Sequence, residues 1–135
     1  MGEIVFCGKR KDNGEWIYGD LFQDRDLNQY YIGYFDYYTD GYSIHREYFQ
    51  HEVMPITIGQ FTGLFDKNER KIFEGNIIKS CENDDVYFVK YCADDNYPAF
   101  DVVPEINIEC NGLSYLHIVE GIEVIGNIHD NAEFV

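Results

Sequence analysis

Hydrophobic and polar residues alternate in short runs along most of this chain, a pattern typical of half-buried β-strands. Residues 4–7 and residues 15–18 are two such runs, rich in aromatic and β-branched side chains. Asp12-Asn13-Gly14 lies between them and favours a turn, because Asn and Gly tolerate positive φ. The sequence therefore predicts two antiparallel strands joined by residues 8–14.

A second hairpin is predicted in the middle of the chain. The β-forming residues 60–64 and 71–73 flank the polar tetrad Asp66-Lys67-Asn68-Glu69, which supplies a turn. Gly75-Asn76 interrupts the pattern before residues 77–79 resume it, and an interior glycine of this kind marks a bulge or a sharp bend.

Three later runs predict further strands at residues 86–91, 115–119 and 123–128. Residues 93–104 carry Asp94-Asp95-Asn96 and two prolines, a composition that predicts a loop.

Residues 43–51 are the only segment for which we consider a helix. They fit either a short helix with Ser43 as its N-cap, or a strand with Ile44 and Tyr48 on one face. We prefer strand or loop.

Many short strands separated by turn signals predict an all-β fold with little helix, built as a small barrel-like or SH3-like antiparallel sheet or as a sandwich. The 135 residues suit one domain, 1–135. Gly8, Asn13, Ile17 and Tyr18 recur at the same spacing as Gly63, Asn68, Ile72 and Phe73. This similarity is either coincidence between two hairpins or a structural repeat, and a repeat would predict two β-subdomains, 1–54 and 55–135.

Composition excludes a disordered chain, because aromatic residues make up 17% and hydrophobic residues 45% of the sequence. No apolar run approaches the roughly 18–20 residues of a membrane span, and the first residues lack the basic and apolar blocks of a signal peptide. We therefore expect a cytoplasmic protein that does not associate with membranes.

The net charge is −15, and it is unevenly distributed. Residues 1–80 hold nine basic and thirteen acidic residues (−4), whereas residues 81–135 hold one basic and twelve acidic residues (−11). Such a surface repels phosphate, so we expect no direct nucleic-acid binding. The acidity is consistent with a basic partner, with mimicry of nucleic acid, or with solubility alone, and the sequence by itself favours solubility.

No metal or cofactor site is predicted. The four cysteines form no C-x-x-C pair and the four histidines have no zinc-finger spacing, so we expect the cysteines to be small, largely buried hydrophobic residues. The pairs Asp84-Asp85 and Asp94-Asp95 do not fit the spacing of an EF-hand and are interpreted as solvated loop charge.

Tyrosines are concentrated between residues 30 and 48. Tyrosine combines a large contact area with a hydrogen-bonding tip, which suits an interface; equally, cross-strand rings could form a ladder that covers a sheet face. Base stacking is a third interpretation that the acidic background opposes. The candidate interface residues are Tyr30, Tyr31, Tyr34, Tyr37, Tyr38 and Tyr42.

Three separated blocks resemble the YopX family of phage and prophage proteins, in the family's order. The first comprises residues 6–10 and 14–21, and the last is the closing stretch 123–131. The central block comprises Val53, Pro55, Thr57, Gly59-Gln60-Phe61-Thr62-Gly63-Leu64, Asp66-Lys67-Asn68 and Ile72-Phe73-Glu74-Gly75-Asn76-Ile77. The resemblance spans nearly the whole chain, with residues 22–52 and 80–120 as its variable parts.

The resemblance implies an all-β, barrel-like protein of viral origin that acts in a bacterial cytoplasm. The family has no established reaction, so it supplies no catalytic residues. This chain departs from the family's pattern at Cys7 (generally Arg), Glu69 (Gly) and Asn76 (Asp).

The sequence leaves several functions open. The first is a phage accessory protein without catalytic activity that binds an unknown host or phage protein, or self-associates, through its tyrosines. The alternative is a nucleic-acid mimic that inhibits a host DNA-binding protein. An enzyme would need His51 or His117 to meet two carboxylates, without any local motif. The acids considered for mimicry are Asp84, Asp85, Asp94, Asp95, Asp101, Glu105 and Glu109.

The glycine-rich block 59–77 could be a binding loop, because glycine lets a backbone approach a ligand. We favour the alternative, in which its residues define the turns and core of a hairpin.

Overall fold

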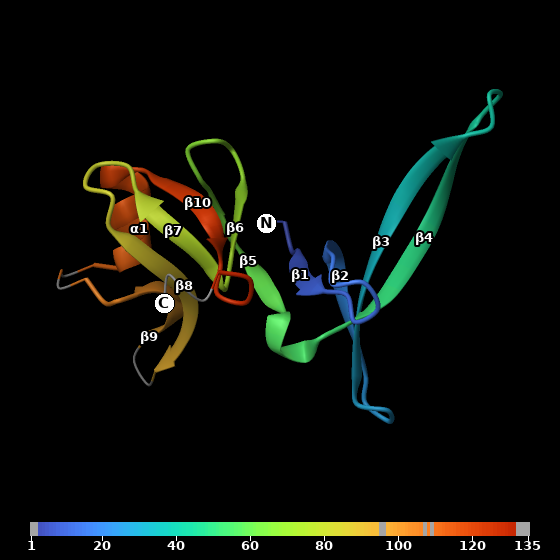
Figure 1. The fold of residues 1–135 in the computed structure, drawn as a ribbon, viewed down its shortest axis with the longest axis horizontal. Coiled ribbons are helices and arrows are strands. Elements are labelled where there is room, and N and C mark those ends of the chain that lie inside the picture. Colours follow the sequence, from blue (N-terminus) through green and yellow to red (C-terminus); the bar gives the residue numbers. More distant parts are fainter. Residues whose placement is uncertain (1–2, 95–96, 107, 109, 132–135) are drawn as a thin grey trace. The chain divides into compact units, whose positions relative to one another are not determined.

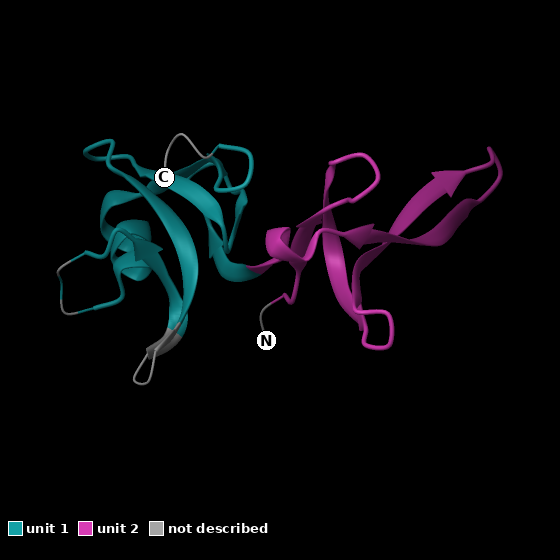
Figure 2. Cartoon of the chain, turned by 60° about the horizontal axis from the view of Figure 1, so that its bottom comes forward, with its two compact units in different colours: residues 1–2, 61–135 teal, residues 3–60 magenta. Residues whose placement is uncertain are grey.

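A computed structural model describes residues 3–94, 97–106, 108 and 110–131 of the chain (Figure 1). The chain forms two compact units, an N-terminal unit of residues Glu3–Gln60 and a C-terminal unit of the residues from Phe61 onward (Figure 2). The internal similarity in the sequence suggests a junction near residues 54–55, whereas the units divide between Gln60 and Phe61. Both units are built mainly from antiparallel strands, as the sequence predicts.

The N-terminal unit is a sheet in which neighbouring strands pair antiparallel, in the order β4-β3-β2-β1-β5. Its elements are β1 (Phe6–Lys9), β2 (Trp16–Asp24), β3 (Gln29–Thr39), β4 (Ile44–Val53), the 3₁₀ turn η1 (Pro55–Thr57) and the start of β5 (Gly59–Phe65). The predicted first hairpin is confirmed, since Cys7 lies opposite Tyr18 and Lys9 opposite Trp16. The preference for a strand over a helix at residues 43–51 is confirmed as well.

This sheet curls until the end of β4 meets the residues that follow β1. An isolated bridge joins Arg10 to Val53, and the Met54 N–H donates to the Lys9 carbonyl at 2.9 Å. Thr57 fixes the next turn, because its hydroxyl donates to the Met54 carbonyl and accepts the Lys9 N–H. The sheet is therefore curved, but within the described residues only one isolated bridge joins its ends, and it does not close into a barrel.

The core of the N-terminal unit depends on a glycine. Ile17, Ile32 and Val53 form the buried cluster, and Ile32 and Val53 are fully buried. A Cβ on Gly8 would lie 2.9 Å from Ile32 Cδ1 and 3.1 Å from Val53 Cβ. The absence of a side chain at Gly8 is thus what allows these two residues to pack on β1.

The C-terminal unit contains a hairpin and a four-stranded antiparallel sheet with the strand order β10-β7-β8-β9. The hairpin pairs the rest of β5 with β6 (Lys71–Phe73), which confirms the second predicted hairpin. The other elements are β7 (Asn76–Ser80), β8 (Val86–Asp94), β9 (Tyr97–Val103), α1 (Gly112–Tyr115), the π-helical turn η2 (Leu116–Glu120) and β10 (Ile122–Asn127). Leu113 and Leu116 from the helical segment share one buried cluster with Ile78, Val89 and Val102 from the sheet.

The strand predicted at residues 115–119 is wrong, because this segment is helical. Asn111 caps it by accepting the Ser114 N–H at 2.8 Å, and Gly121, at a φ of 76°, ends it. Leu113 and Leu116, three residues apart, supply the buried face. The β-branched pair Ile118-Val119, which gave the strand signal, is exposed.

The loop predicted at residues 93–104 is wrong as well. β8 continues to Asp94, and β9 pairs with it from Tyr97 to Val103. The strand tolerates Pro98 because β9 is an edge strand, where a missing N–H need not break a ladder.

Asp66 ties the turn between β5 and β6 to β10. Its carboxylate is buried and accepts the N–H groups of Asn68 and Arg70 at 2.9 Å and of Val124 at 3.0 Å. Burial alone would raise the pKa of Asp66, but the three donors, helped by the Arg70 charge, outweigh it and lower that pKa.

Replacing Asp66 should destabilise the protein in graded steps. Asp66→Ala leaves the three N–H groups without this acceptor and should lower the free energy of unfolding by roughly 2–3 kcal/mol. Asp66→Asn keeps one oxygen and should cost about half of that, roughly 1–1.5 kcal/mol. Because the folded-state pKa of Asp66 is depressed, its contribution is present above the unfolded pKa and is lost as the pH falls through the folded one.

Urea unfolding at neutral and acidic pH measures these differences. The control is Asp85→Ala, at an exposed carboxylate of the same unit, which should change the stability by less than about 0.5 kcal/mol. Equal stability of Asp66→Ala and the control would contradict the role given to Asp66.

Candidate functional site

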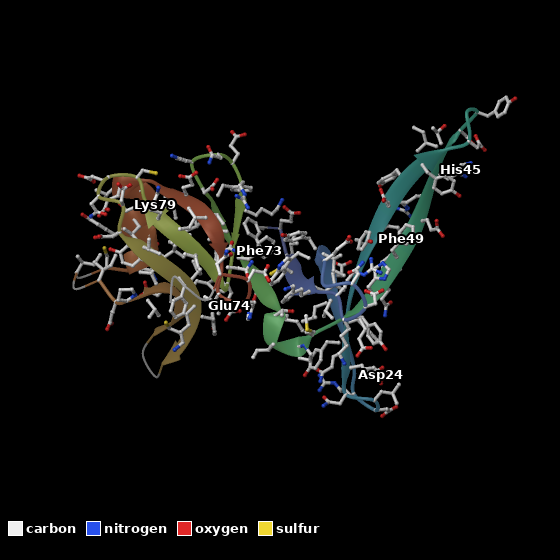
Figure 3. All side chains as sticks on the ribbon, in the orientation of Figure 1. Asp24, His45, Phe49, Phe73, Glu74 and Lys79 are labelled. Atoms are coloured by element: carbon white, nitrogen blue, oxygen red, sulfur yellow. The ribbon has the colours of Figure 1, made fainter. Side chains whose placement is uncertain are left out.

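The hairpin of β3 and β4 extends beyond the strand that supports it. β3 pairs with β4 from Tyr30 to Thr39, but β2 pairs with β3 only as far as Gly33. Residues 34–49, the distal hairpin, therefore form a two-stranded ribbon that extends away from the rest of the N-terminal unit (Figure 2). Figure 3 shows side chains on both sides of this ribbon, with Phe49 nearer its base and His45 nearer its tip.

The register assigns the side chains of the distal hairpin to two faces, because successive residues of a strand point to opposite sides. The first face carries the cross-strand pairs Tyr34–Phe49, Asp36–Glu47 and Tyr38–His45. The second face carries the pairs Phe35–Tyr48, Tyr37–Arg46 and Thr39–Ile44. Both faces thus combine aromatic rings with charged groups.

Ring contacts hold the two strands together. On the first face the ring centroids of Tyr34 and Phe49 lie 5.7 Å apart and those of Tyr38 and His45 lie 5.1 Å apart, both pairs stacked. On the second face Phe35 meets Tyr48 edge to face at 4.9 Å, and the Arg46 guanidinium lies 4.3 Å from the centroid of Phe35. Such cross-strand pairs contribute roughly 0.2–1 kcal/mol each.

The six tyrosines predicted as an interface divide into two groups. Tyr30, Tyr31 and Tyr34 are half-buried at the base: the first and last pack against the core, and the Tyr31 hydroxyl donates to Gln29 Oε1 at 2.6 Å. Tyr37, Tyr38 and Tyr42 are exposed on the distal hairpin.

Three further residues of the distal hairpin are exposed: Phe35, Ile44 and Tyr48. Tyr48 belongs to the tyrosine-rich stretch 30–48, whereas Phe35 and Ile44 were not predicted. The sequence carried a signal for Phe35 and Tyr48, since each stands beside another aromatic residue instead of alternating with polar ones.

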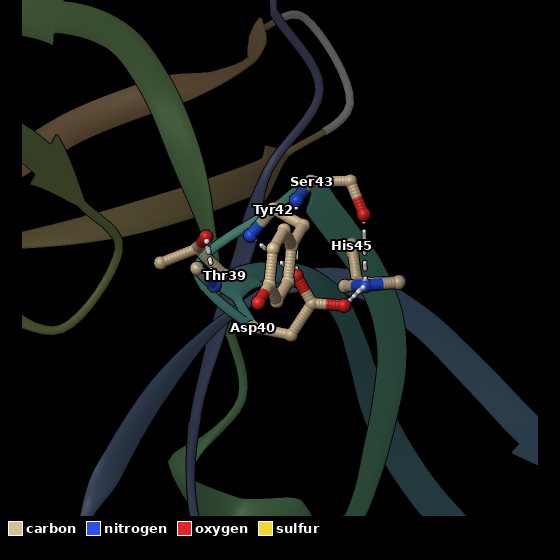
Figure 4. A network of polar contacts seen from close by, with 6 residues as sticks. Thr39, Asp40, Tyr42, Ser43 and His45 are labelled. Carbon is tan, nitrogen blue, oxygen red and sulfur yellow. Dashed lines mark hydrogen bonds and ion pairs between the residues drawn. The ribbon is translucent and has the colours of Figure 1, made fainter.

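The hairpin tip is ordered by one carboxylate (Figure 4). Asp40 Oδ1 accepts the N–H groups of Tyr42 at 2.8 Å and Ser43 at 2.9 Å, and Asp40 Oδ2 lies 2.8 Å from His45 Nε2. Gly41, at a φ of 94°, makes the turn possible. This arrangement displays the Tyr42 side chain at the apex, where it is 98% exposed.

Asp40, Ser43 and His45 bring together the three residue types of a hydrolase triad, which the sequence analysis did not foresee. Ser43 Oγ lies 3.2 Å from His45 Nε2, the same nitrogen that Asp40 contacts. A triad needs the hydroxyl and the carboxylate on opposite ring nitrogens. The trio therefore has the geometry of a turn and not that of a proton relay.

The glycine-rich block 59–77 shapes backbone. Gly63 and Gly75 both have a positive φ, and the Gly75 N–H donates to the Val89 carbonyl at 2.8 Å. Asn76 Oδ1 accepts the Phe73 N–H at 2.7 Å.

The closing block has the same kind of role. Asn127 Oδ1 accepts two N–H groups, those of His129 and Asp130, each at 2.9 Å. Asn131 Oδ1 in turn accepts the Asn127 N–H at 3.1 Å. These contacts give the glycine-rich block and the closing block a role in shaping the fold.

The acidic residues considered for mimicry do not all face outward. Asp101 is half-buried, and its carboxylate accepts the Leu113 N–H at 3.2 Å, which ties α1 to β9. Asp84 lies 3.9 Å from the Lys79 ammonium. Asp85 and Glu105 are exposed. Asp95, Glu109 and the side chain of Asp94 lie outside the described residues.

The expectation that the cysteines are largely buried is wrong for two of them. Cys7 is buried, whereas Cys81 and Cys110 are exposed. Both exposed cysteines stand outside the β-strands. Among the described residues, no group of three His, Cys, Asp or Glu side chains is placed to hold a metal ion. The described helices are only a few residues long and fall well short of a membrane-spanning segment.

The contacts at the hairpin tip predict a measurable lowering of the pKa of Asp40. The His45 contact, followed by the Ser43 and Tyr42 N–H groups, lowers the pKa of Asp40 from 3.8 to about 2. Because the folded-state pKa lies below the unfolded one, the tip should stay ordered above about pH 4 and lose this stabilisation as the pH falls through about 2.

Carboxyl ¹³C NMR of the full chain measures the midpoint directly. In His45→Ala the Asp40 midpoint should rise toward 3.8 without reaching it, because the two N–H donors remain. Ser43→Ala, which keeps its backbone N–H, is the control and should leave the midpoint near 2. An unchanged midpoint in His45→Ala would contradict the contact.

The chain resembles the crystal structure of protein EF1440 from Enterococcus faecalis with a TM-score of 0.60, at 24% identity and covering 98% of each chain. At this identity the likeness concerns the fold. Among curated proteins, none matches significantly. The model of the family described as "YopX protein" matches residues 5–135. The resemblance inferred from the three motif blocks is thereby confirmed, and this chain belongs to the YopX family.

Proposed function

We propose that this YopX family protein is a non-catalytic protein-binding module and that the distal hairpin is its contact surface. The observation that carries the proposal is the exposure of large apolar residues on both faces of one ribbon. The exposed fractions are 49% for Phe35, 65% for Tyr37, 54% for Tyr38, 79% for Ile44 and 46% for Tyr48. Clustered exposed rings of this kind are typical of binding surfaces.

The buried core does not account for these exposed side chains. The buried cluster of the N-terminal unit consists of Ile17, Ile32 and Val53, all outside residues 34–49. A two-stranded ribbon is only marginally stable by itself. The part of β3 and β4 that extends past the pairing with β2 therefore has a cost in stability. A partner that covers the rings would recover that cost through buried apolar area.

The backbone of the distal hairpin offers a second means of binding. In the described part of the chain, residues 34–39 of β3 and 44–49 of β4 pair only with each other, so both outer edges of the distal hairpin lack a neighbouring strand. Such edges accept an extended segment of another protein by adding a strand. The Asp40 contacts hold the tip in one conformation and reduce the entropy lost on binding.

The partner that we propose is a host or phage protein met in a bacterial cytoplasm, where the protein would act as a phage or prophage accessory factor. Self-association through the same hairpin is less favourable, because two copies with a net charge of −15 each repel one another.

Replacing exposed residues of the distal hairpin should abolish capture of the partner. The variant Tyr37→Ser, Tyr42→Ser, Ile44→Ser removes three side chains that are 65%, 98% and 79% exposed, so the fold should be kept. Tyr34 is left intact because it packs against the core. We expect at least a tenfold loss of captured protein from a lysate of infected cells, since interface anchors commonly cost more than about 1–2 kcal/mol each.

The matched control is Leu27→Ser, Ile56→Ser, Ile118→Ser, at residues that are 65%, 81% and 78% exposed elsewhere on the chain. Its capture should equal that of the unmodified protein. Quantitative mass spectrometry compares the three proteins, and equal recovery with the hairpin variant would remove the hairpin as the contact surface.

A further inference from the structure

The first face of the distal hairpin places two carboxylates directly opposite one another. Asp36 and Glu47 form a cross-strand pair, and like charges in that position destabilise a sheet. One oxygen of Asp36 accepts the Tyr37 N–H at 2.9 Å, and no ion pair among the described residues involves either carboxylate. The pair therefore carries two negative charges that no cation of the hairpin compensates.

Aromatic rings stand on both sides of this carboxylate pair. The stacked rings of Tyr34 and Phe49 precede it along the ribbon, and the stacked rings of Tyr38 and His45 follow it. The faces of such rings attract cations, and a guanidinium both stacks on aromatic rings and pairs with carboxylates. The second face shows that the ribbon accepts such a group, because Arg46 lies over Phe35 there.

From these positions we infer that the first face binds a Lys or Arg side chain of an extended basic segment in the partner protein. This rests on the proposed function and names the partner's chemistry. The cation would lie between Asp36 and Glu47, flanked by the rings of Tyr34 and Tyr38. Asp40 does not compete for it, since both of its oxygens are already engaged at the tip.

Charge complementarity favours a basic partner over a second copy of this chain. The net charge of −15 attracts a basic segment and repels another copy. The hairpin's own cation, Arg46, lies on the opposite face from Asp36 and Glu47. Two copies would have to join first face to second face, which gives a head-to-tail contact that does not close into a dimer.

The test uses the full-length ¹⁵N-labelled chain and a short peptide of alternating Thr and Val residues with Arg at its centre. Titration followed by NMR should move the amide signals of Asp36, Tyr38 and Glu47 most. The double variant Asp36→Asn, Glu47→Gln should bind the peptide roughly 5–10-fold more weakly, as expected for two partly exposed charge contacts. The same peptide with Glu at its centre should bind the unmodified chain at least tenfold more weakly than the Arg peptide.

The matched control is Asp20→Asn, Asp26→Asn, which removes the same net charge from exposed positions of the same unit. It should weaken binding of the Arg peptide less than twofold. Unchanged binding in the Asp36, Glu47 variant, or an equal loss in the control, would overturn the inference.

The two proposals fail separately. Loss of partner capture in the Tyr37, Tyr42, Ile44 variant together with unchanged Arg-peptide binding in the Asp36, Glu47 variant would remove the cation site and leave the hairpin as a binding surface.

Discussion

The candidate site depends on the pairing of β3 with β4. This pairing continues past Gly33, the last residue of β3 that pairs with β2. Apart from Tyr34, which packs against the core, residues 34–49 of the described chain pair only with one another. The ribbon is anchored at its base, where Ile32 and Val53 are fully buried. The Tyr48 phenol lies so close to Gly33 that a Cβ on Gly33 would collide with the phenol. At its far end, Asp40 fixes the turn. Ring pairs between these two anchors keep the register, so the rings that stabilise the ribbon are also the rings that it displays.

The motif blocks and the candidate site occupy different parts of the chain for a physical reason. The blocks around Gly8, Gly75 and Asn127 set close approaches and turns that the fold cannot form with other residues at those positions. The distal hairpin lies between the first two blocks, within residues 22–52, which none of the motif blocks covers. A ribbon held by cross-strand pairs can change its exposed side chains without disturbing the buried cluster of Ile17, Ile32 and Val53.

Turn chemistry was the most reliable guide from sequence to fold. Asp12-Asn13-Gly14 and the tetrad 66–69 each located a hairpin, because these residues favour the backbone angles of a turn wherever they stand. The strand prediction for residues 115–119 was wrong. It gave more weight to their β-branched side chains than to the cap at Asn111 and the spacing of Leu113 and Leu116. The tyrosine cluster indicated the right hairpin but not which rings are exposed. That distinction depends on where β3 stops pairing with β2, at Gly33, and no local pattern in β3 records it.

The carboxylates of this protein differ in what they contact. Some accept hydrogen bonds that stabilise the fold, and others remain available to a binding partner. Asp66 is buried and accepts three N–H groups, Asp101 ties α1 to β9, and Asp40 orders the hairpin tip. Each of these charges is compensated within its own unit. Asp36 and Glu47 face one another on an exposed surface, and a solubilising role alone would be served equally well by carboxylates spread far apart. Their placement between two aromatic pairs concentrates negative charge where rings are already displayed, which is the combination that a cationic side chain recognises.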